Sequence, residues 1–394
     1  MLYTSNIRQA MLVERQAALT LRAPGRLHLG FLDPGGSLGR RFGSLGLVID
    51  GFETEVELSP SPSQHVSASG PAEQAEIERA ARSLHLLQRH SGRHDPLHLR
   101  LVRVLPVHAG FGSGTSLALA IGRACARWHG LDDSTPLLAQ WLGRGLRSGI
   151  GIAGFDQGGL LVDGGPGADG SAAPILSRIA LPETWRVLIV QDSSLQGLSG
   201  AEERHAIATL PSLPSARAAE ICHQVLMRVL PGAATADFAP FAAGISRLQQ
   251  LLGEHFAPAQ GDSAYSSVAV GRLIEWIGHQ RDAAQGPERG AAIGQSSWGP
   301  TGFAILPSHE IAAAVVDAAR AAQVIAPVTD AAHRVGPQQR GQRDRSPFDL
   351  THAPLARHSA RALTRVGPHH RSLGQPEVSW NVPSSSTCSR RAAR

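Results

Sequence analysis

The strongest chemical signal in the sequence is a glycine-rich segment, residues 106–116, between a predicted strand and a predicted helix. Closely spaced glycines let successive backbone N–H groups turn toward one point, and the N-terminus of the following helix adds a partial positive charge. These features predict a phosphate-binding loop, although a helix cap with glycines for tight packing is the alternative. The candidate binding residues are Gly110, Gly112, Ser113, Gly114 and Thr115.

All 37 basic residues of the chain are arginine, since the sequence contains no lysine. A Walker A phosphate loop, a Schiff-base lysine and a Ser–Lys dyad are therefore excluded. The G-x-G-x-G spacing of the loop also departs from the dinucleotide-binding fingerprint. Any bound anion must be held by arginine, backbone N–H groups, hydroxyls or a metal ion.

A second glycine-rich segment, residues 144–165, carries two arginines. Because a guanidinium group binds phosphate oxygens through two parallel hydrogen bonds, Arg144 and Arg147 are predicted to bind phosphate, together with Ser148. Asp156 is our candidate for a catalytic base, a metal ligand or a group that orients a hydroxyl. A turn or cap residue is an equally good interpretation of it.

A third cluster begins with Arg26 and His28, whose side chains would share one face of a strand. We take both as candidate catalytic residues, with a structural histidine as the alternative for His28. Arg40 and Arg41 follow in a glycine-rich loop, and their pairing suits a multiply charged anion. A solvated loop is the alternative for this pair.

A fourth cluster, residues 294–302, places glycine and serine before an apolar strand. Such residues allow the backbone to approach a ligand closely, so Ser296 and Ser297 are candidate substrate-binding residues. Trp298 either covers an aromatic substrate or fills the interface between two domains, and the sequence leaves both open. No metal ligands are assigned.

The elements that must position these clusters alternate along the chain, which predicts the α+β class. Alternating apolar and polar residues predict strands, the first divided by a turn at Pro24-Gly25. Helical spacing predicts helices, one of them capped by Asp237. The predicted strands cover residues 18–30, 45–58, 97–106, 175–180, 185–191 and part of 291–306. The predicted helices cover residues 73–90, 116–128, 136–146, 201–209, 215–230, 238–256, 267–280 and 311–323.

The composition changes near residue 326, where apolar periodicity ends. Residues 326–394 hold 11 arginines against four acidic residues, so the chain's net charge of +5 belongs to this tail. Its Arg/Pro/Ser-rich composition predicts disorder. Nucleic-acid binding and translation out of frame are the alternatives. We expect an N-terminal domain at 1–170, a second domain at 171–325 and this tail.

The three cysteines are far apart, which favours neither a disulfide framework nor a zinc site. The N-terminus lacks the long apolar stretch of a secretory signal, and no apolar run reaches the roughly 18 residues of a membrane span. We expect a cytoplasmic protein that binds small molecules, with no membrane partner and no nucleic acid.

The order of residues 23–26, 106–116 and 148–157 resembles the GHMP small-molecule kinase superfamily, and within it the chain is similar to the branch of the β-ribofuranosylaminobenzene 5′-phosphate synthases. The resemblance covers about residues 19–323. It implies a two-domain GHMP-kinase-like fold, with an N-terminal domain like ribosomal protein S5 domain 2 and a ferredoxin-like C-terminal domain. It rests on residues 26–33, 39–46, 110–115, 144–163 and 294–302.

The resemblance also implies a reaction, in which 4-aminobenzoate is joined to phosphoribosyl pyrophosphate with release of carbon dioxide and pyrophosphate in tetrahydromethanopterin biosynthesis. We expect Mg²⁺ as a helper, no requirement for ATP, and a homodimer. The alternative is an ATP-dependent kinase of the same superfamily, with Asp156 as the base and Arg26 as its partner. Relatives continue past residue 323 into a final strand, which the tail replaces here.

Overall fold

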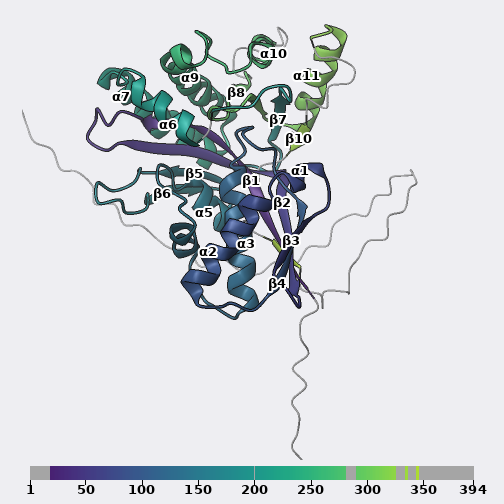
Figure 1. Cartoon of the computed structure of the whole chain (residues 1–394). Coiled ribbons are helices and arrows are strands. Elements are labelled where there is room, and N and C mark those ends of the chain that lie inside the picture. The colour runs from purple at the N-terminus through teal and green to yellow at the C-terminus, as the bar shows by residue number, and fades with distance from the viewer. Residues whose placement is uncertain (1–17, 199, 281–289, 325–332, 336–342, 346–394) are drawn as a thin grey trace, which may run out of the picture. The chain divides into compact units, whose positions relative to one another are not determined.

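The computed structural model describes residues 18–198, 200–280, 290–324, 333–335 and 343–345. All of its helices and strands belong to one compact unit, shown in colour in Figure 1. They form a seven-stranded sheet and a four-stranded sheet, and helices pack on both, with α9 (Phe238–Phe256) in contact with each. The α+β class is confirmed. The N-terminal segment and most of the predicted tail lie outside the described residues.

The first sheet has the strand order β11-β1-β2-β4-β3, and β5 joins it by pairing with both β2 and β6. Neighbouring strands are antiparallel except β3 and β4. Its strands are β1 (Leu19–Asp33), β2 (Phe42–Pro60), β3 (His65–Ala68), β4 (Leu97–Arg103), β5 (Leu160–Asp163), β6 (Ile175–Ile179) and β11 (Arg343–Arg345). We expected β6 in the second domain, but its pairing with β5 places it in the first sheet.

Strand β1 is continuous, so the predicted turn at Pro24-Gly25 is wrong. The register with β2 shifts there from Glu53 opposite Pro24 to Ile49 opposite Gly25. The extra residues lie in β2, where they form a bulge that bends the pair without interrupting it. Because of the bend, the first half of this long strand packs in the core between the first sheet and its helices. Arg26 and His28 lie beyond that half.

Helices α1, α2, α3 and α5 contact the first sheet, α4 packs on α2, α3 and α5, and Figure 1 shows α2 and α3 side by side. Helix α3 is buried on most of its surface because the sheet, α2, α4 and α5 surround it. Helix α4 ends five residues before the predicted boundary, since Gly143 and Gly145 adopt positive φ. The helices are α1 (Pro71–Gln74), α2 (Ile77–Ser91), α3 (Ser113–Trp128), α4 (Thr135–Trp141) and α5 (Ile150–Gln157).

The second sheet is antiparallel with the order β10-β7-β9-β8, and α9, α10 and α11 contact it. Asp237 occupies the N-cap position of α9 as predicted, but its side chain makes no capping hydrogen bond. The strands are β7 (Arg186–Gln191), β8 (Ala292–Gln295), β9 (Thr301–Leu306) and β10 (His333–Val335). The helical segments are α6 (Gly200–Thr209), α7 (Ser215–Gln224), the π-helical η1 (Val225–Val229), α8 (Leu230–Thr235), α9 (Phe238–Phe256), the short η2 (Ala257–Ala259), α10 (Val268–His279) and α11 (His309–Ala321).

Strand β10 lies within the segment predicted to be disordered. It pairs antiparallel with β7, with Arg334 opposite Leu188. The expectation that no strand closes this edge is therefore wrong for three residues, His333–Val335. Backbone groups make the pairing, so a segment without apolar periodicity is able to supply it. The predicted limits of the second domain, residues 171 and 325, otherwise stay a prediction.

One hydrophobic core runs from the first sheet into the second. It includes Leu27 of β1, Leu47 of β2, Ile245 of α9 and Phe303 of β9, all fully buried. Phe111, from the glycine-rich loop, is part of the same cluster. The loop is thus anchored where the two sheets share a core. No helix within the described residues combines the length and apolarity needed to cross a membrane.

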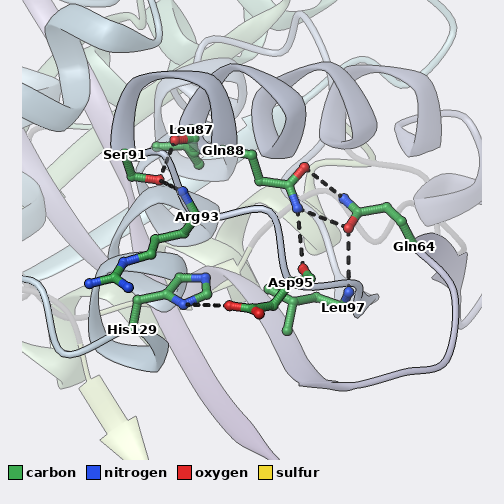
Figure 2. A network of polar contacts seen from close by, with 8 residues as sticks. All are labelled: Gln64, Leu87, Gln88, Ser91, Arg93, Asp95, Leu97 and His129. Carbon is green, nitrogen blue, oxygen red and sulfur yellow. Dashed lines mark hydrogen bonds and ion pairs between the residues drawn. The ribbon is translucent and has the colours of Figure 1, made fainter.

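A polar network closes the far end of the first sheet (Figure 2). Gln88 and Gln64 exchange hydrogen bonds in both directions, and Gln64 also accepts from the backbone N–H of Leu97. His129 Nδ1 lies 3.6 Å from a carboxylate oxygen of Asp95. His129 is the C-cap of α3, so the network lies about 24 Å from the glycine-rich loop at the other end of this helix.

Candidate functional site

The glycine-rich loop leads directly into α3, with Gly112 as the N-cap. Gly110 and Gly112 both adopt positive φ, 89° and 75°, a region that favours glycine. A Cβ on Gly110 would overlap the carbonyl oxygen of Ser296. The N–H groups of Ser113 and Gly114 open the first turn of α3, where they have no partner inside the helix. The local geometry is that of an anion-binding helix N-terminus.

Arg26 lies against this loop. Its Nη1 donates to the carbonyl of Gly110 at 2.9 Å, and its guanidinium group lies beside Gly112, where an added Cβ would come within 3.1 Å of Cζ. Burial lowers the pKa of Arg26 to about 10, and nearby Glu203 opposes that shift. Arg26 therefore remains charged at neutral pH and places a cation on the loop.

Arg144 reaches the same turn from the other side. Its Nη1 would lie 3.4 Å from a Cβ on Gly114, and Arg79 Nη1 would lie 3.8 Å from it. Burial and the neighbouring Arg79 lower the pKa of Arg144. Its buried Nε has no hydrogen-bond partner in the described part of the chain. Arg79 was not predicted, because on a helix such as α2 an arginine is more often a solvent-exposed residue.

Arg147 makes an ion pair with Glu203 of α6, at 2.7 Å between Nη2 and Oε2. Its Nη1 is buried without a hydrogen-bond partner among the residues described. The positive charges of Arg26 and Arg147 both act on His28. The second and third sequence clusters are thus brought together, with Glu203 as an acidic residue that the sequence did not assign to the site.

His28 connects the loop with the fourth cluster. Its backbone N–H donates to Ser296 Oγ at 3.0 Å, and that hydroxyl donates to the Gly110 carbonyl at 2.7 Å. The carbonyl of His28 accepts from the backbone N–H of Ser297 at 3.2 Å. Burial, with Arg26 and Arg147 adding to it, lowers the pKa of His28 to about 3, so the imidazole is neutral at physiological pH.

An aromatic pocket, with a cavity volume of about 40 Å³, opens beside His28. Phe31 lies 4.6 Å from the His28 ring, and Phe256 lies 4.7 Å from the Trp298 ring, measured between centroids. All four residues line the pocket. Trp298, whose role was left open, is one of its walls. The lining, aromatic side chains with a few polar groups, is typical of a small-molecule site.

Gly30 makes room for the pocket wall. Its φ is +142°, and an added Cβ would overlap Leu252 and lie 2.8 Å from Leu248. Glycine at this position therefore allows α9 to pack directly on β1. Gln249, on the same helix, donates to the Leu29 carbonyl and accepts from the Gln295 backbone N–H. These contacts fix α9 and β8 against the strand that carries His28.

Arg40 and Arg41 bind loop carbonyls. Arg40 donates to the Gly165 carbonyl through Nε and Nη2, at 3.2 and 3.0 Å. Arg41 donates to the Pro34 carbonyl at 3.1 Å and lies over the Phe42 ring. Neither contact joins them to the glycine-rich loop. Their predicted substrate-binding roles stay predictions.

Ser148 organises its own loop. Its hydroxyl donates to Asp163 at 3.0 Å, and the same carboxylate accepts from the N–H groups of Gly149 and Gly165, both at 2.8 Å. Burial raises the pKa of Asp163, and these hydrogen bonds oppose the shift. The hydroxyl predicted to hold a phosphate thus fixes the segment between Arg147 and α5. Its phosphate-binding role remains a prediction.

Asp156 lies toward the other end of α3. It accepts a hydrogen bond from Thr135 at 2.8 Å, and Thr135 also accepts from Arg123 at 2.6 Å. Arg123 is ten residues beyond Ser113, or about 15 Å along the helix. The structure does not bring Asp156 beside Arg26, so its catalytic role is a prediction without geometric support.

The described residues contain no group of three or more His, Cys, Asp or Glu side chains arranged to hold a metal ion. Magnesium does not require such a group, because it commonly binds one or two carboxylates together with substrate phosphates. Glu203, paired with Arg147, and Glu76, paired with Arg79, are carboxylates beside the arginines of the loop. The Mg²⁺ expectation stays a prediction.

Comparison with known proteins identifies the family. Residues 77–159 match the GHMP kinases N terminal domain. The chain is 33% identical over 304 residues to a β-ribofuranosylphenol 5′-phosphate synthase of Archaeoglobus fulgidus, which covers 74% of this chain and 88% of that protein. It belongs to this synthase family. A synthase of the same name from Methanothermobacter thermautotrophicus is 31% identical over 59% of this chain and 75% of that protein. The prediction of an enzyme from this branch is confirmed.

Solved structures show the same fold. A homoserine kinase from Cytophaga hutchinsonii aligns with a TM-score of 0.58 at 16% identity, covering 88% of this chain and 100% of that chain. A mevalonate diphosphate decarboxylase from Staphylococcus aureus aligns with a TM-score of 0.59 at 13% identity, covering 84% and 98%. The GHMP-kinase-like fold predicted for the synthase family is thereby confirmed.

Proposed function

We propose that this enzyme joins C1 of phosphoribosyl pyrophosphate to the ring carbon that carries the carboxylate of a 4-substituted benzoate. Pyrophosphate leaves C1, carbon dioxide leaves the ring, and the product is an aryl ribofuranose 5′-phosphate. The observation that carries the proposal is two buried guanidinium nitrogens, Arg144 Nε and Arg147 Nη1, that no described residue pairs with, near a phosphate loop and an aromatic pocket.

Buried guanidinium nitrogens without partners cost free energy, about 1–3 kcal/mol each for an uncharged group and more for a charged one. An anion that accepts hydrogen bonds from them removes this cost. Arg26, Arg144 and Arg147 together with the first turn of α3 offer several donors to the phosphate groups of the substrate. The same donors would stabilise the negative charge that develops on departing pyrophosphate.

Loss of pyrophosphate leaves C1 electron-poor. The ring carbon para to an electron-donating substituent attacks it, and loss of carbon dioxide restores aromaticity. This chemistry asks the protein mainly for positioning and charge stabilisation. A neutral aromatic pocket beside a cationic loop provides both in one place.

Two acceptors follow from two observations. The sequence resemblance implies 4-aminobenzoate, which gives an aminobenzene product. The curated relatives are named as synthases of a ribofuranosylphenol 5′-phosphate, and 4-hydroxybenzoate would give that product by the same reaction. We propose 4-substituted benzoates as the substrate class and include both acids in each test.

Several expectations from the sequence belong to the same proposal. They are assistance by Mg²⁺ on the pyrophosphate, no use of ATP, a place in tetrahydromethanopterin biosynthesis, a cytoplasmic location and a homodimer. Mg²⁺, when bound, would supply positive charge to the leaving group. Titration of activity with Mg²⁺ and EDTA tests the first, and analytical ultracentrifugation tests the last.

A kinase reaction is the second candidate, because the fold neighbours include kinases. It would need a base beside the phosphate loop. Asp156, the residue predicted for that role, is hydrogen-bonded to Thr135 toward the far end of α3. The position of this carboxylate favours the synthase over the kinase.

The deciding assay mixes purified protein with phosphoribosyl pyrophosphate and carboxyl-labelled 4-hydroxybenzoate or 4-aminobenzoate. We expect release of labelled carbon dioxide and one equivalent of pyrophosphate, with no dependence on ATP. Folded protein that releases no carbon dioxide from either acid would exclude the synthase. Consumption of ATP with a small-molecule acceptor would establish the kinase instead.

A further inference from the structure

The aromatic pocket is lined by His28, whose imidazole has a buried polar atom that no described residue pairs with. His28 is 4% exposed, and its Nε2 is buried with no hydrogen-bond partner in the described part of the chain. A buried polar atom without a partner costs free energy unless a ligand pairs with it. This nitrogen belongs to a residue that lines the pocket.

The neighbouring amides do not compete for this role. Gln249 uses its oxygen for the Gln295 N–H and its nitrogen for the Leu29 carbonyl. Gln295 accepts from the Ser266 N–H at 2.7 Å and donates to Gln260 at 2.9 Å. These amides are engaged with the protein, whereas His28 Nε2 has no partner among the described residues and is available to a ligand.

The hydrogen-bond role of Nε2 follows from its surroundings. The ring of His28 is neutral, and its hydrogen bond with the backbone of His28 itself raises the pKa, opposing the effect of burial. A backbone bond that favours the protonated ring is one in which a ring N–H donates to the carbonyl. Since Nε2 has no partner among the residues described, that donor is Nδ1. Nε2 is then a lone-pair acceptor, which suits an O–H or N–H group and not a carboxylate.

We propose that the pocket of Phe31, Phe256 and Trp298 is the aromatic acceptor subsite, and that His28 Nε2 accepts the proton of the hydroxyl para to the benzoate carboxylate. The inference rests on the proposed function and adds the place of the ring and the role of His28. It selects 4-hydroxybenzoate as the acid that makes full use of this site.

The step balances as follows. The C1–carbon bond forms as the C1–oxygen bond to pyrophosphate breaks, and the hydroxyl proton moves to His28 Nε2, which leaves a neutral dienone. The bond from the ring to the carboxylate then breaks and releases carbon dioxide. Its electron pair restores the aromatic ring, and the phenolic oxygen regains the proton from His28.

The charges around His28 suit a transient proton. Arg26 and Arg147 disfavour its protonated form in the empty site. Phosphate groups bound to these arginines would offset that effect, so His28 would become a better base when phosphoribosyl pyrophosphate is present. Because the hydroxyl becomes strongly acidic as the ring gains positive charge, a weakly basic imidazole is sufficient.

An amino substituent makes a different demand. Its nitrogen carries the positive charge as an iminium group without losing a proton. Removing the proton acceptor should therefore slow turnover of 4-hydroxybenzoate much more than that of 4-aminobenzoate. This ratio of two substrates in one variant is insensitive to partial misfolding, because a loss of folded protein lowers both rates equally.

The test compares His28→Gln, His28→Phe and the control His65→Gln, which replaces an exposed histidine on β3. We expect His28→Gln to lower kcat for 4-hydroxybenzoate by about 10²-fold, within the range of general-base effects, and to change kcat for 4-aminobenzoate less than threefold. His28→Phe should also raise KM for 4-hydroxybenzoate about tenfold without changing KM for phosphoribosyl pyrophosphate. His65→Gln should match the wild type.

Equal losses with the two acids would overturn the role of His28, as would an increase confined to KM for phosphoribosyl pyrophosphate, which would place a ribose hydroxyl on Nε2. The subsite is tested separately by NMR titration of 4-hydroxybenzoate into wild type and Phe256→Ala. Weaker binding to the variant supports the pocket, and equal binding overturns it. This arm remains decisive even if the wild type forms no product, the result that would refute the proposed function alone.

Discussion

The two ends of α3 carry polar clusters of opposite character. At the C-terminal end, the network around Gln64 and Gln88 satisfies its own amides and is largely exposed (Figure 2). At the N-terminal end, Arg144, Arg147 and His28 each leave a buried nitrogen without a partner in the described residues. Polar groups with a structural role pair with one another. At the N-terminal end of α3, by contrast, donors and an acceptor that no described residue pairs with are available to a ligand.

Removing one of the arginines at the N-terminal end of α3 should have the largest effect on activity. For Arg144→Met we expect kcat/KM for phosphoribosyl pyrophosphate to fall by about 10²–10³-fold, as for other lost charge-stabilising donors. Stability should stay equal or rise, because the pKa of Arg144 is lowered by burial and by Arg79, which shows that its charge is disfavoured in the empty site. Steady-state kinetics and thermal unfolding measure the two effects. Arg82→Met, at an exposed position of α2, is the control, and a Tm loss in Arg144→Met alone would assign that arginine a structural role.

The packing of α9 on β1, next to His28, can be tested at Gly30. We expect Gly30→Ala to destabilise the fold by about 1–3 kcal/mol, since the new methyl group meets Leu248 and Leu252 and the backbone has φ of +142°. Urea unfolding measures the change. Leu252→Ala in the same chain should recover part of the loss by making room. Additive losses in the double variant would show that contact with α9 is not the cause.

The lowered pKa of His28 predicts a difference in the pH dependence of stability between the wild type and His28→Phe. Burial lowers its pKa from 6.5 to about 3, so between these values the unfolded chain binds a proton that the folded chain does not. The free energy of unfolding should therefore fall as the pH falls through this window, with a contribution of about 1.4 kcal/mol per pH unit from this residue. Urea unfolding between pH 4.5 and 7 should show a shallower slope in His28→Phe. Parallel slopes for variant and wild type would contradict the shift.

The smallest effect should come from a substitution in the polar network at the C-terminal end of α3. We expect Gln88→Ala to cost about 0.5–1 kcal/mol, because its hydrogen bonds with Gln64 are exposed and water replaces them. Its kinetic constants should equal those of the wild type. A change in kcat larger than twofold would show that the far end of α3 communicates with the loop.

Much of the site could be predicted from the sequence because glycine-rich segments that carry arginine are typical of anion binding. The segments of Gly110, Arg26, Arg147 and Ser296 were all recognised, and the structure brings them together. Their combination also identified the synthase branch. The order of predicted elements gave the correct class, and most helices begin and end near their predicted bounds.

The remaining parts depend on contacts distant in sequence. Arg79 has the pattern of an ordinary solvent-facing helical residue, and only packing of α2 on α3 brings it to the loop. Glu203 was not assigned to the site, because its ion pair with Arg147 spans 56 positions of the sequence. Asp156 had a suggestive neighbourhood in sequence, but α5 carries it toward the far end of α3. Periodicity also did not reveal β10, because strand pairing there is made by the backbone.

The contact between the two glycine-containing loops has a consequence for how the substrates bind. Gly110 meets the backbone of Ser296, and Gly299 meets the backbone of Ala109, with no side chain between them to absorb a displacement. A sugar phosphate that shifts the first loop must therefore also shift the segment that carries Trp298. Binding of the two substrates should therefore be coupled. By reciprocity, each should change the affinity of the other by the same factor.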